Sequence, residues 1–317
     1  MNVTSLLNPR AAGLVFSLLL LCSCATTPDP SASGPAAFDA STIVPASQLP
    51  AEVTMNKDAG RGNFLFVTLR LENGEELPFV VDTGAPGTTF HKSLATRLGK
   101  RLDTTTITMP EEEQESGVYA APKLYLEGTP LMTGTKVHTL DFKRLSSRCG
   151  HPIMGLLGMD CLRHYCIQLD FEAGKTRFLN PDRVKAAELG KSFPLRFSNE
   201  SQDQSDEIRP YIHHTGLLGG TSTNSLIDTG QTSDGSVEKS ALNGHFLTRI
   251  KHFLRPSWAV GLPQSVWDGE TYTNLFVDIG RDANQLGLRF LARHLVTFDF
   301  PNQTMYLNQT SAGPLKK

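Results

Sequence analysis

The sequence predicts an all-β protein built from two related halves. The tripeptide Asp-Thr-Gly occurs twice, at 82–84 and at 228–230, and each copy ends a short apolar run. Each copy is followed later in the chain by a similar second block. A repeated order of parts indicates an internal duplication. Two carboxylates at strand ends, one from each half, indicate a single shared site.

Short segments rich in β-branched and aromatic residues alternate with turn signals in the first half. Asn73-Gly74 predicts a hairpin turn, after which the returning strand delivers Asp82 at its end. Gly99 ends a short helical segment. The half closes with Met154–Asp160, a short helical piece and a strand pair joined at Ala173-Gly174. The expected strands are Asn63–Leu71, Leu77–Val81, Thr104–Met109, Val118–Leu126, Lys136–Leu140, Ile167–Phe171 and Thr176–Leu179, and the expected helical segment is Ser93–Leu98.

The second half repeats this order. One strand ends at Asp228, and Leu286–Leu291 is similar to Leu157–Leu162. A strand pair at Leu295–Phe300 and Thr304–Leu307 then matches the pair that closes the first half. The repeat supports two lobes of similar construction.

Composition limits the possible partners and the number of domains. The chain has 317 residues, of which 39% are hydrophobic, enough for a core in one large domain or two ordinary ones. Its formal net charge of -2 argues against nucleic-acid binding. The polar segment Glu188–Asp206 contains the expected join. We expect the two lobes at residues 51–185 and 186–317.

The N-terminus predicts a leader rather than a folded element. Arg10 supplies a positive charge, and Ala11–Leu21 is apolar but too short to span a bilayer. The Leu21-Cys22-Ser23-Cys24 run resembles a bacterial lipoprotein signal, with residues 1–23 removed and lipid attached to Cys24. An ordinary secretory signal with incidental cysteines is the alternative. Lipid on Cys24 places the protein outside the cytoplasm on a bacterial membrane, facing the periplasm or the cell surface.

Residues 24–50 are rich in Ala, Ser, Thr and Pro, and we expect them to form a disordered tether. Three cysteines remain beyond it, Cys149, Cys161 and Cys166, which allow one disulfide at most. A bridge from Cys149 is plausible in an oxidising compartment. The Cys161, His164 and Cys166 spacing does not fit a zinc site, so small core side chains are the expected role.

The two Asp-Thr-Gly loops and the Leu156-Leu157-Gly158 segment together carry a resemblance to a known family. The chain resembles the aspartic proteases of the retropepsin-like and pepsin-like group over Asn63–Leu307. The resemblance implies the two-lobed acid-protease (double-barrel) fold with a pseudo-two-fold repeat and short helices. A single chain with both loops is expected to act as a monomer.

In this reading Asp82 and Asp228 are the catalytic pair. The resemblance implies that the hydroxyls of Thr83 and Thr229 brace the two loops against each other. Gly84 and Gly230 let the loop backbones approach closely. The implied activity is that of an aspartic-type endopeptidase.

Two close carboxyl groups share one proton because both cannot ionise comfortably. Aspartic proteases are the standard case of this splitting. The ionised carboxylate accepts a proton from water, and the protonated one polarises the scissile carbonyl. This chemistry requires no metal ion and no cofactor. The expected partners are a peptide or protein substrate and, through the lipid, a membrane.

Two departures from the family pattern support rival interpretations. Gln231 follows the second loop, at a position where small residues are usual in the family. Its side chain either crowds the carboxyl pair or forms a hydrogen bond with nearby backbone and leaves the pair undisturbed. The hairpin at Pro110–Gly117 has four glutamates and no glycine before its end. These features favour a non-catalytic peptide-binding lipoprotein of the same fold. A third possibility is that the first lobe pairs with another chain.

Overall fold

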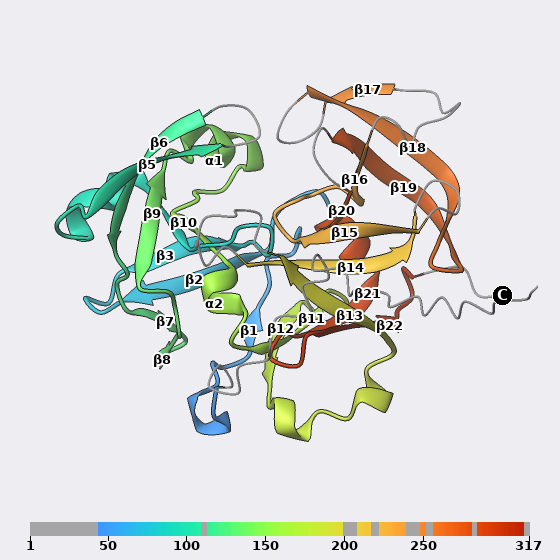
Figure 1. Cartoon of the computed structure of the whole chain (residues 1–317), viewed down its shortest axis with the longest axis horizontal. Helices are drawn as coiled ribbons and strands as arrows, with labels where there is room; N and C mark the ends of the chain where they lie inside the picture. The colour runs from blue at the N-terminus through green and yellow to red at the C-terminus, as the bar shows by residue number, and fades with distance from the viewer. Residues whose placement is uncertain are drawn as a thin grey trace, which may run out of the picture. The chain divides into compact units, whose positions relative to one another are not determined.

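The computed structural model describes residues 44–108, 113–198, 208–216, 222–238, 248–251, 256–280 and 284–313. Within these ranges the protein is mostly β, with two sheets and a few short helices (Figure 1). The expected all-β class is therefore confirmed. Among the described helices, none has the length and apolar character needed to cross a membrane. The predicted leader, Cys24 and most of the predicted tether lie outside the described residues.

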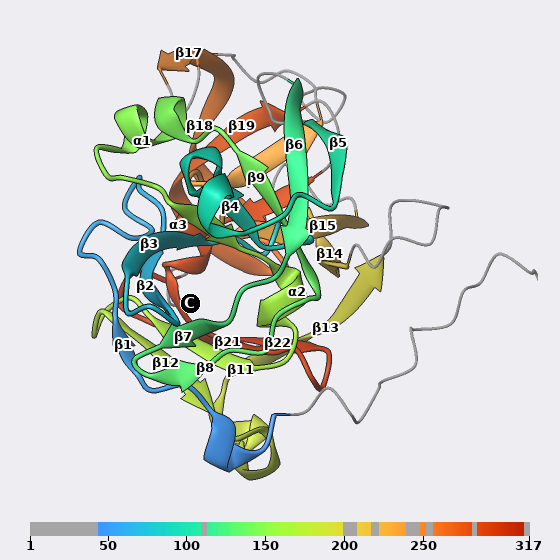
Figure 2. The same cartoon turned by 90° about the vertical axis from the view of Figure 1, so that its left-hand side faces the viewer.

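The first sheet has nine strands and is made entirely from the first half of the chain. Parallel pairing of β10 with β3 sets the backbone beside the first Asp-Thr-Gly loop. Figure 2 shows β5 and β6 as an antiparallel hairpin at the edge of this sheet. In sheet order the strands are β5 (Asp103–Thr108), β6 (Glu113–Ala120), β9 (Lys136–Leu140), β4 (Thr89–His91), β10 (Gly155–Leu157), β3 (Glu76–Val81), β2 (Phe66–Leu71), β7 (Leu124–Leu126) and β8 (Thr129–Pro130).

The second sheet has thirteen strands and draws on both halves of the chain. Parallel pairing of β20 with β15 sets the backbone beside the second loop, as β10 does beside the first. In sheet order the strands are β1 (Val53–Thr54), β12 (Lys175–Leu179), β11 (Cys166–Asp170), β21 (His294–Asp299), β22 (Thr304–Gln309), β13 (Lys191–Ser198), β14 (Arg209–Thr215), β15 (Ser222–Asp228), β20 (Gln285–Gly287), β16 (Gly235–Glu238), β19 (Glu270–Gly280), β18 (Pro256–Trp267) and β17 (Thr248–Lys251).

Helices are short in both halves. The segment expected at Ser93–Leu98 is a 3-10 helix, which the ring of His91 caps by accepting a hydrogen bond from the Ser93 N–H. The helices are α1 (Lys143–Cys149), α2 (Met159–Leu162), α3 (Leu288–Leu291) and the 3-10 helices η2 (Ala46–Gln48), η3 (Lys92–Arg97), η4 (Pro181–Arg183) and η5 (Ala186–Glu188).

The single strand expected at Val118–Leu126 is wrong. The chain instead forms β6, which ends at Ala120, and β7, which begins at Leu124. Pro122 lies between them and has no N–H to donate to a strand ladder. The interruption lets β6 pair with β9 and β7 pair with β2.

The predicted tether also extends too far along the chain. Residues 44–50 are part of the folded unit, because Val44 is only 2% exposed and belongs to the main hydrophobic cluster. Leu49 packs against the same cluster. Burial of these two apolar side chains offsets the entropy cost of ordering the segment.

The disulfide considered for Cys149 does not form. All three cysteines among the described residues are free and buried. Cys149 lies with Phe142 and Ile153 in the smaller hydrophobic cluster, whereas Cys161 lies in the main one. Cysteine here serves as a small buried apolar side chain, as the core role predicted.

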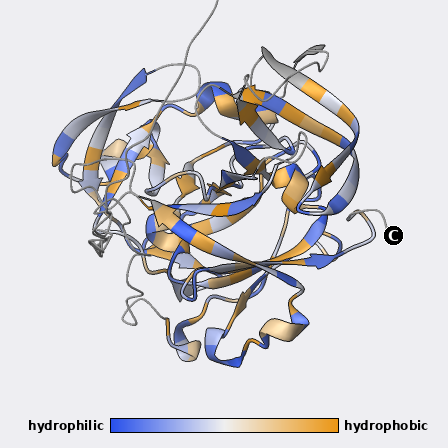
Figure 3. Cartoon of the chain, turned by 45° about the vertical axis from the view of Figure 1, so that its right-hand side comes forward, coloured by the Kyte–Doolittle hydropathy of each residue, from blue (hydrophilic) through white to orange (hydrophobic). Residues whose placement is uncertain are grey.

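One large hydrophobic cluster contains side chains from both halves of the chain. Alternation along the strands produces it, for example in β2, where Val67 and Leu69 are buried and their neighbours are not. Figure 3 shows hydrophobic and hydrophilic residues alternating along several strands. The halves therefore share a core.

The central strands of the two halves pair with each other in a symmetric register. β11 and β21 each follow a short helix and each form a hairpin with the next strand. They pair antiparallel, with Gln168 opposite Thr297 in the middle of the register. The Gln168 side chain donates to Thr297 Oγ1 at 3.2 Å. Equivalent strands thus meet about a local two-fold arrangement.

Two threonines interlock the halves at the loops. Thr83 Oγ1 donates to the Ile227 carbonyl at 2.7 Å and accepts from the Thr229 N–H at 3.0 Å. Thr229 Oγ1 donates to the Val81 carbonyl at 2.7 Å and accepts from the Thr83 N–H at 3.0 Å. Both side chains are buried. Each hydroxyl therefore satisfies a buried donor and a buried acceptor of the opposite loop.

We predict that Thr83→Val lowers the free energy of unfolding by about 2–4 kcal/mol, because it leaves a buried N–H and a buried carbonyl without partners. Thr83→Ser keeps the hydroxyl and serves as the matched control, with a loss of about 1 kcal/mol or less. Urea denaturation of both variants measures the difference. Equal losses for Val and Ser would contradict a role for these hydrogen bonds.

Candidate active site

Each Asp-Thr-Gly loop accepts a backbone hydrogen bond from a glycine-containing turn of its own half. In the first half the Met159 N–H donates to the Ala85 carbonyl at 2.9 Å, and in the second the Leu288 N–H donates to the Gln231 carbonyl at 2.7 Å. A Cβ on Gly158 would lie 2.6 Å from the backbone carbonyl of Gly87, and no side chain fits there. The loops are thus fixed by backbone contacts of the same kind.

The structure brings the carboxyl groups of Asp82 and Asp228 close enough together for each to affect the pKa of the other. Glycine makes this approach possible. A Cβ on Gly84 would lie 2.6 Å from Cγ of Asp228, and a Cβ on Gly230 would lie 2.7 Å from Cγ of Asp82. Each carboxyl therefore occupies the space that a side chain on the opposite loop would need.

Burial raises the pKa of both carboxyl groups, and the negative charge of Asp82 raises the pKa of Asp228 further. Backbone N–H groups act in the opposite direction. Asp82 Oδ1 accepts from Gly84 at 2.9 Å and from Ala85 at 3.1 Å, while Asp228 Oδ1 accepts from Gly230 at 2.8 Å. The additional N–H favours negative charge on Asp82 more than on Asp228.

Arg209, the first residue of β14, contributes a positive charge to the same site. Its field lowers the pKa of Asp82 and of Asp228, although burial outweighs it in both cases. Arg209 could not be predicted from the sequence, because a lone arginine after a polar segment belongs to no motif. The pairing of β14 with β15, which delivers Asp228, accounts for its proximity.

Gln231 does not stand between the two carboxyl groups. Its amide nitrogen donates to Ser233 Oγ at 2.8 Å and to Asp278 Oδ2 at 2.7 Å. Both amide hydrogens are therefore used by groups of the second half. Of the two interpretations of Gln231, the structure favours local hydrogen bonding over crowding of the pair.

Two further contacts next to the loops were missed from the sequence. Thr88 donates to Asp160 Oδ1 at 2.7 Å in the first half. At the corresponding place in the second half, buried Asp234 forms ion pairs with Arg289 at 3.4 Å and Arg293 at 3.0 Å. The sequence does hold a signal for these contacts, because Thr88 and Asp234 each stand six residues after the aspartate of their own loop.

Some of the remaining predicted site features lie outside the described residues. The tip of the hairpin at Pro110–Gly117 lies partly outside the described residues, which resume at Glu113. Cys24 also lies outside them. In the described part of the chain, no group of three or more His, Cys, Asp or Glu side chains is arranged to hold a metal ion.

Comparison with known proteins bears on the first half of this site. Residues 67–161 match the model of a family described as aspartyl protease. The matched segment runs from β2 to α2 and includes the first Asp-Thr-Gly loop and Leu156-Leu157-Gly158, while Asp228 lies beyond it. Comparison with curated proteins gives no match. An aspartyl protease family domain is therefore present at residues 67–161.

Proposed function

We propose that the protein is an aspartic-type endopeptidase in which Asp82 and Asp228 form the catalytic pair. The observation that carries this proposal is the close approach of two carboxyl groups from separate halves, each in the space beside the glycine of the opposite loop. The aspartyl protease match at residues 67–161 supports the assignment of the first loop. The second loop repeats the same tripeptide, the same threonine interlock and the same supporting turn.

The proposed reaction uses the asymmetry of the pair. Ionised Asp82 accepts a proton from a water molecule as the water oxygen attacks the scissile carbonyl carbon. Protonated Asp228 gives its proton to the carbonyl oxygen, which yields a neutral tetrahedral diol. As the diol collapses the C–N bond breaks, Asp82 donates its newly acquired proton to the leaving nitrogen, and ionised Asp228 accepts a proton from one diol hydroxyl, which restores the starting state of the pair. The scheme forms no covalent enzyme intermediate.

The proposed fold is the bilobal acid-protease fold, with lobes at about residues 51–185 and 186–317. Support comes from the β11–β21 register and from the interlock of Thr83 with Thr229, which relate the halves symmetrically. The β5–β6 hairpin, at the free edge of the nine-stranded sheet, is the proposed flap. A peptide substrate would lie extended and pair its backbone with strand edges. The chain is proposed to act as a monomer.

We predict that Asp82→Asn and Asp228→Asn each lower peptide cleavage by about 10²–10⁴-fold, since each removes one half of the proton transfer. The chain beginning at Ala25 is incubated with a mixed peptide pool across a range of pH, and products are measured by mass spectrometry. Asp182→Asn, in the exposed 3-10 helix η4, is the matched control and should retain activity. Identical peptide profiles for the wild type and both site variants would overturn the enzyme assignment, and binding without cleavage would favour the peptide-binding alternative.

The raised pKa of Asp228 also predicts a pH-dependent stability. The folded state holds the proton more tightly than the unfolded chain, whose carboxyl titrates near 3.8. The resulting stabilisation is present at about pH 4 and is lost as pH rises through the folded pKa. Asp228→Asn, which cannot ionise, should therefore raise stability over the wild type at about pH 8 by about 1–3 kcal/mol and change it little at about pH 4.

Urea denaturation at both pH values measures this effect. Asp182→Asn again supplies the control, because its exposed side chain lies outside the carboxyl pair. A stability difference for Asp228→Asn that does not change with pH would contradict preferential proton binding by the folded pair.

We further propose that the protein is anchored outside the cytoplasm through lipid on Cys24. The support is the Leu21-Cys22-Ser23-Cys24 run after a short apolar segment. Cys24→Ser is predicted to move the protein from the membrane fraction to another fraction on cell fractionation. Cys149→Ser, which changes a buried cysteine of the fold, is the control. Membrane association that survives Cys24→Ser would exclude this anchor.

A further inference from the structure

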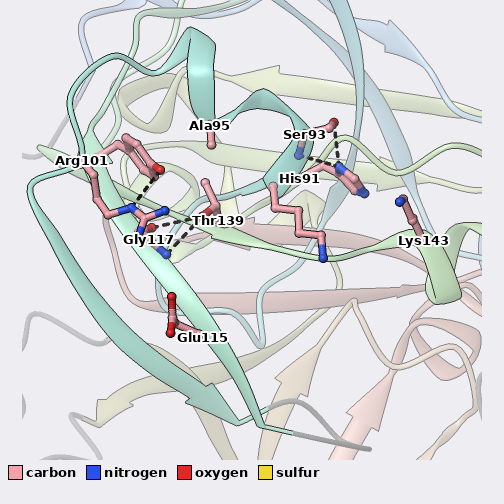
Figure 4. Close-up of a pocket in the computed structure, with 10 residues that line it drawn as sticks. His91, Ser93, Ala95, Arg101, Glu115, Gly117, Thr139 and Lys143 are labelled. Atoms are coloured by element: carbon pink, nitrogen blue, oxygen red, sulfur yellow. Dashed lines mark hydrogen bonds between the residues drawn. The ribbon is translucent and has the colours of Figure 1, made fainter.

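A pocket that does not include the carboxyl pair lies in the first half of the chain. Its volume is about 510 Å³, within the usual range for small-ligand sites. The lining comes from the last residue of β4, η3, the loop before β5, β6, β9 and the first residue of α1 (Figure 4). Neither Asp82 nor Asp228 is part of it.

Four segments of the first half contribute charged side chains to this pocket. Lys92 of η3, Arg101 of the following loop and Lys143 of α1 are cationic, and Glu115 of β6 is anionic. In Figure 4, Arg101 and Lys143 lie on opposite sides of the pocket. A ligand between them would be within the field of two positive charges that come from different parts of the sheet.

Part of this positive charge is already balanced. Lys92 forms an ion pair with Asp141 at 2.5 Å, and Glu115 lies within electrostatic range of Arg101. Burial lowers the pKa of His91, so this ring is neutral near pH 7. Among the described residues, no ion-pair partner faces the Lys143 side chain. One positive charge therefore remains for a ligand to balance.

A buried hydroxyl adds directional hydrogen bonding. Tyr119 is only 3% exposed, and its hydroxyl accepts a hydrogen bond from Arg101 Nε at 3.3 Å. The O–H of Tyr119 remains as a donor. The terminal nitrogens of Arg101 and the ammonium of Lys143 are donors as well. The pocket thus combines several donors with a single unbalanced positive charge.

We propose that this pocket binds the carboxylate of a ligand, either a small organic acid or an acidic side chain of a peptide. A singly charged carboxylate matches the one unbalanced charge of Lys143 and accepts hydrogen bonds from the available donors. A doubly charged phosphate would experience repulsion from the nearby carboxylates of Glu115 and Asp141. Because β6 is one strand of the β5–β6 hairpin, an occupant would tie this hairpin to η3 and α1.

Isothermal titration calorimetry of the full chain in non-ionic detergent tests the proposal. The probes are glutarate, the peptide acetyl-Ala-Glu-Ala-amide, its matched acetyl-Ala-Gln-Ala-amide, and inorganic phosphate. We expect saturable binding of an acid-bearing probe in the millimolar range, weakened by added salt, with little binding of the neutral peptide. Stronger binding of glutarate or of the acidic peptide distinguishes a free acid from a peptide ligand.

Variants locate the binding. Lys143→Gln is expected to weaken binding about fivefold, the upper end for an exposed ion pair, whereas Lys136→Gln, an exposed lysine of β9 that does not line the pocket, should leave it unchanged. Asp82→Asn should also leave it unchanged, which separates this site from the proposed catalytic pair. No saturable binding up to about 50 mM, tighter binding of phosphate, or equal weakening by Lys143→Gln and Lys136→Gln would overturn the proposal.

Discussion

The structure depends on the reciprocal fit between each aspartate and the glycine of the opposite loop. The carboxyl of Asp228 occupies the space beside Gly84, and the carboxyl of Asp82 occupies the space beside Gly230. A carboxyl in such a place is removed from water, so its charged form is disfavoured. The same contact that closes the interface between the halves therefore accompanies a raised pKa of both carboxyl groups. The packing of the two loops and the raised pKa of both carboxyl groups therefore have the same structural cause.

The threonine interlock keeps this fit in place. Buried backbone groups need partners, and the hydroxyls of Thr83 and Thr229 supply them across the interface. The β11–β21 pairing repeats the symmetry at a distance from the loops. Both contacts relate equivalent residues of the two halves.

The symmetry is broken in the polar contacts beside the loops. Where the first half uses a neutral hydroxyl against a carboxyl, Thr88 with Asp160, the second half uses a buried carboxylate, Asp234, against two arginines. Burial raises the pKa of Asp160, which is compatible with its neutral partner. The two halves thus keep one geometry with different charges. The backbone contacts of the pair are likewise unequal, because Asp82 Oδ1 accepts one more backbone N–H than Asp228 Oδ1.

The sequence by itself determined the class of structure and the two loops. Strand alternation, turn residues and the repeated tripeptide are local signals, so they predicted a mostly β chain in which Asp82 and Asp228 end strands. The same signals missed the interruption at Pro122, where the structure has two strands in place of the one expected. Only the tertiary structure shows that the two carboxyl groups lie close together and that Gln231 donates a hydrogen bond to Asp278. It also decided that Cys149 stays unpaired. These contacts join residues far apart in the chain, and their energies depend on burial and distance, which exist only after the halves have packed.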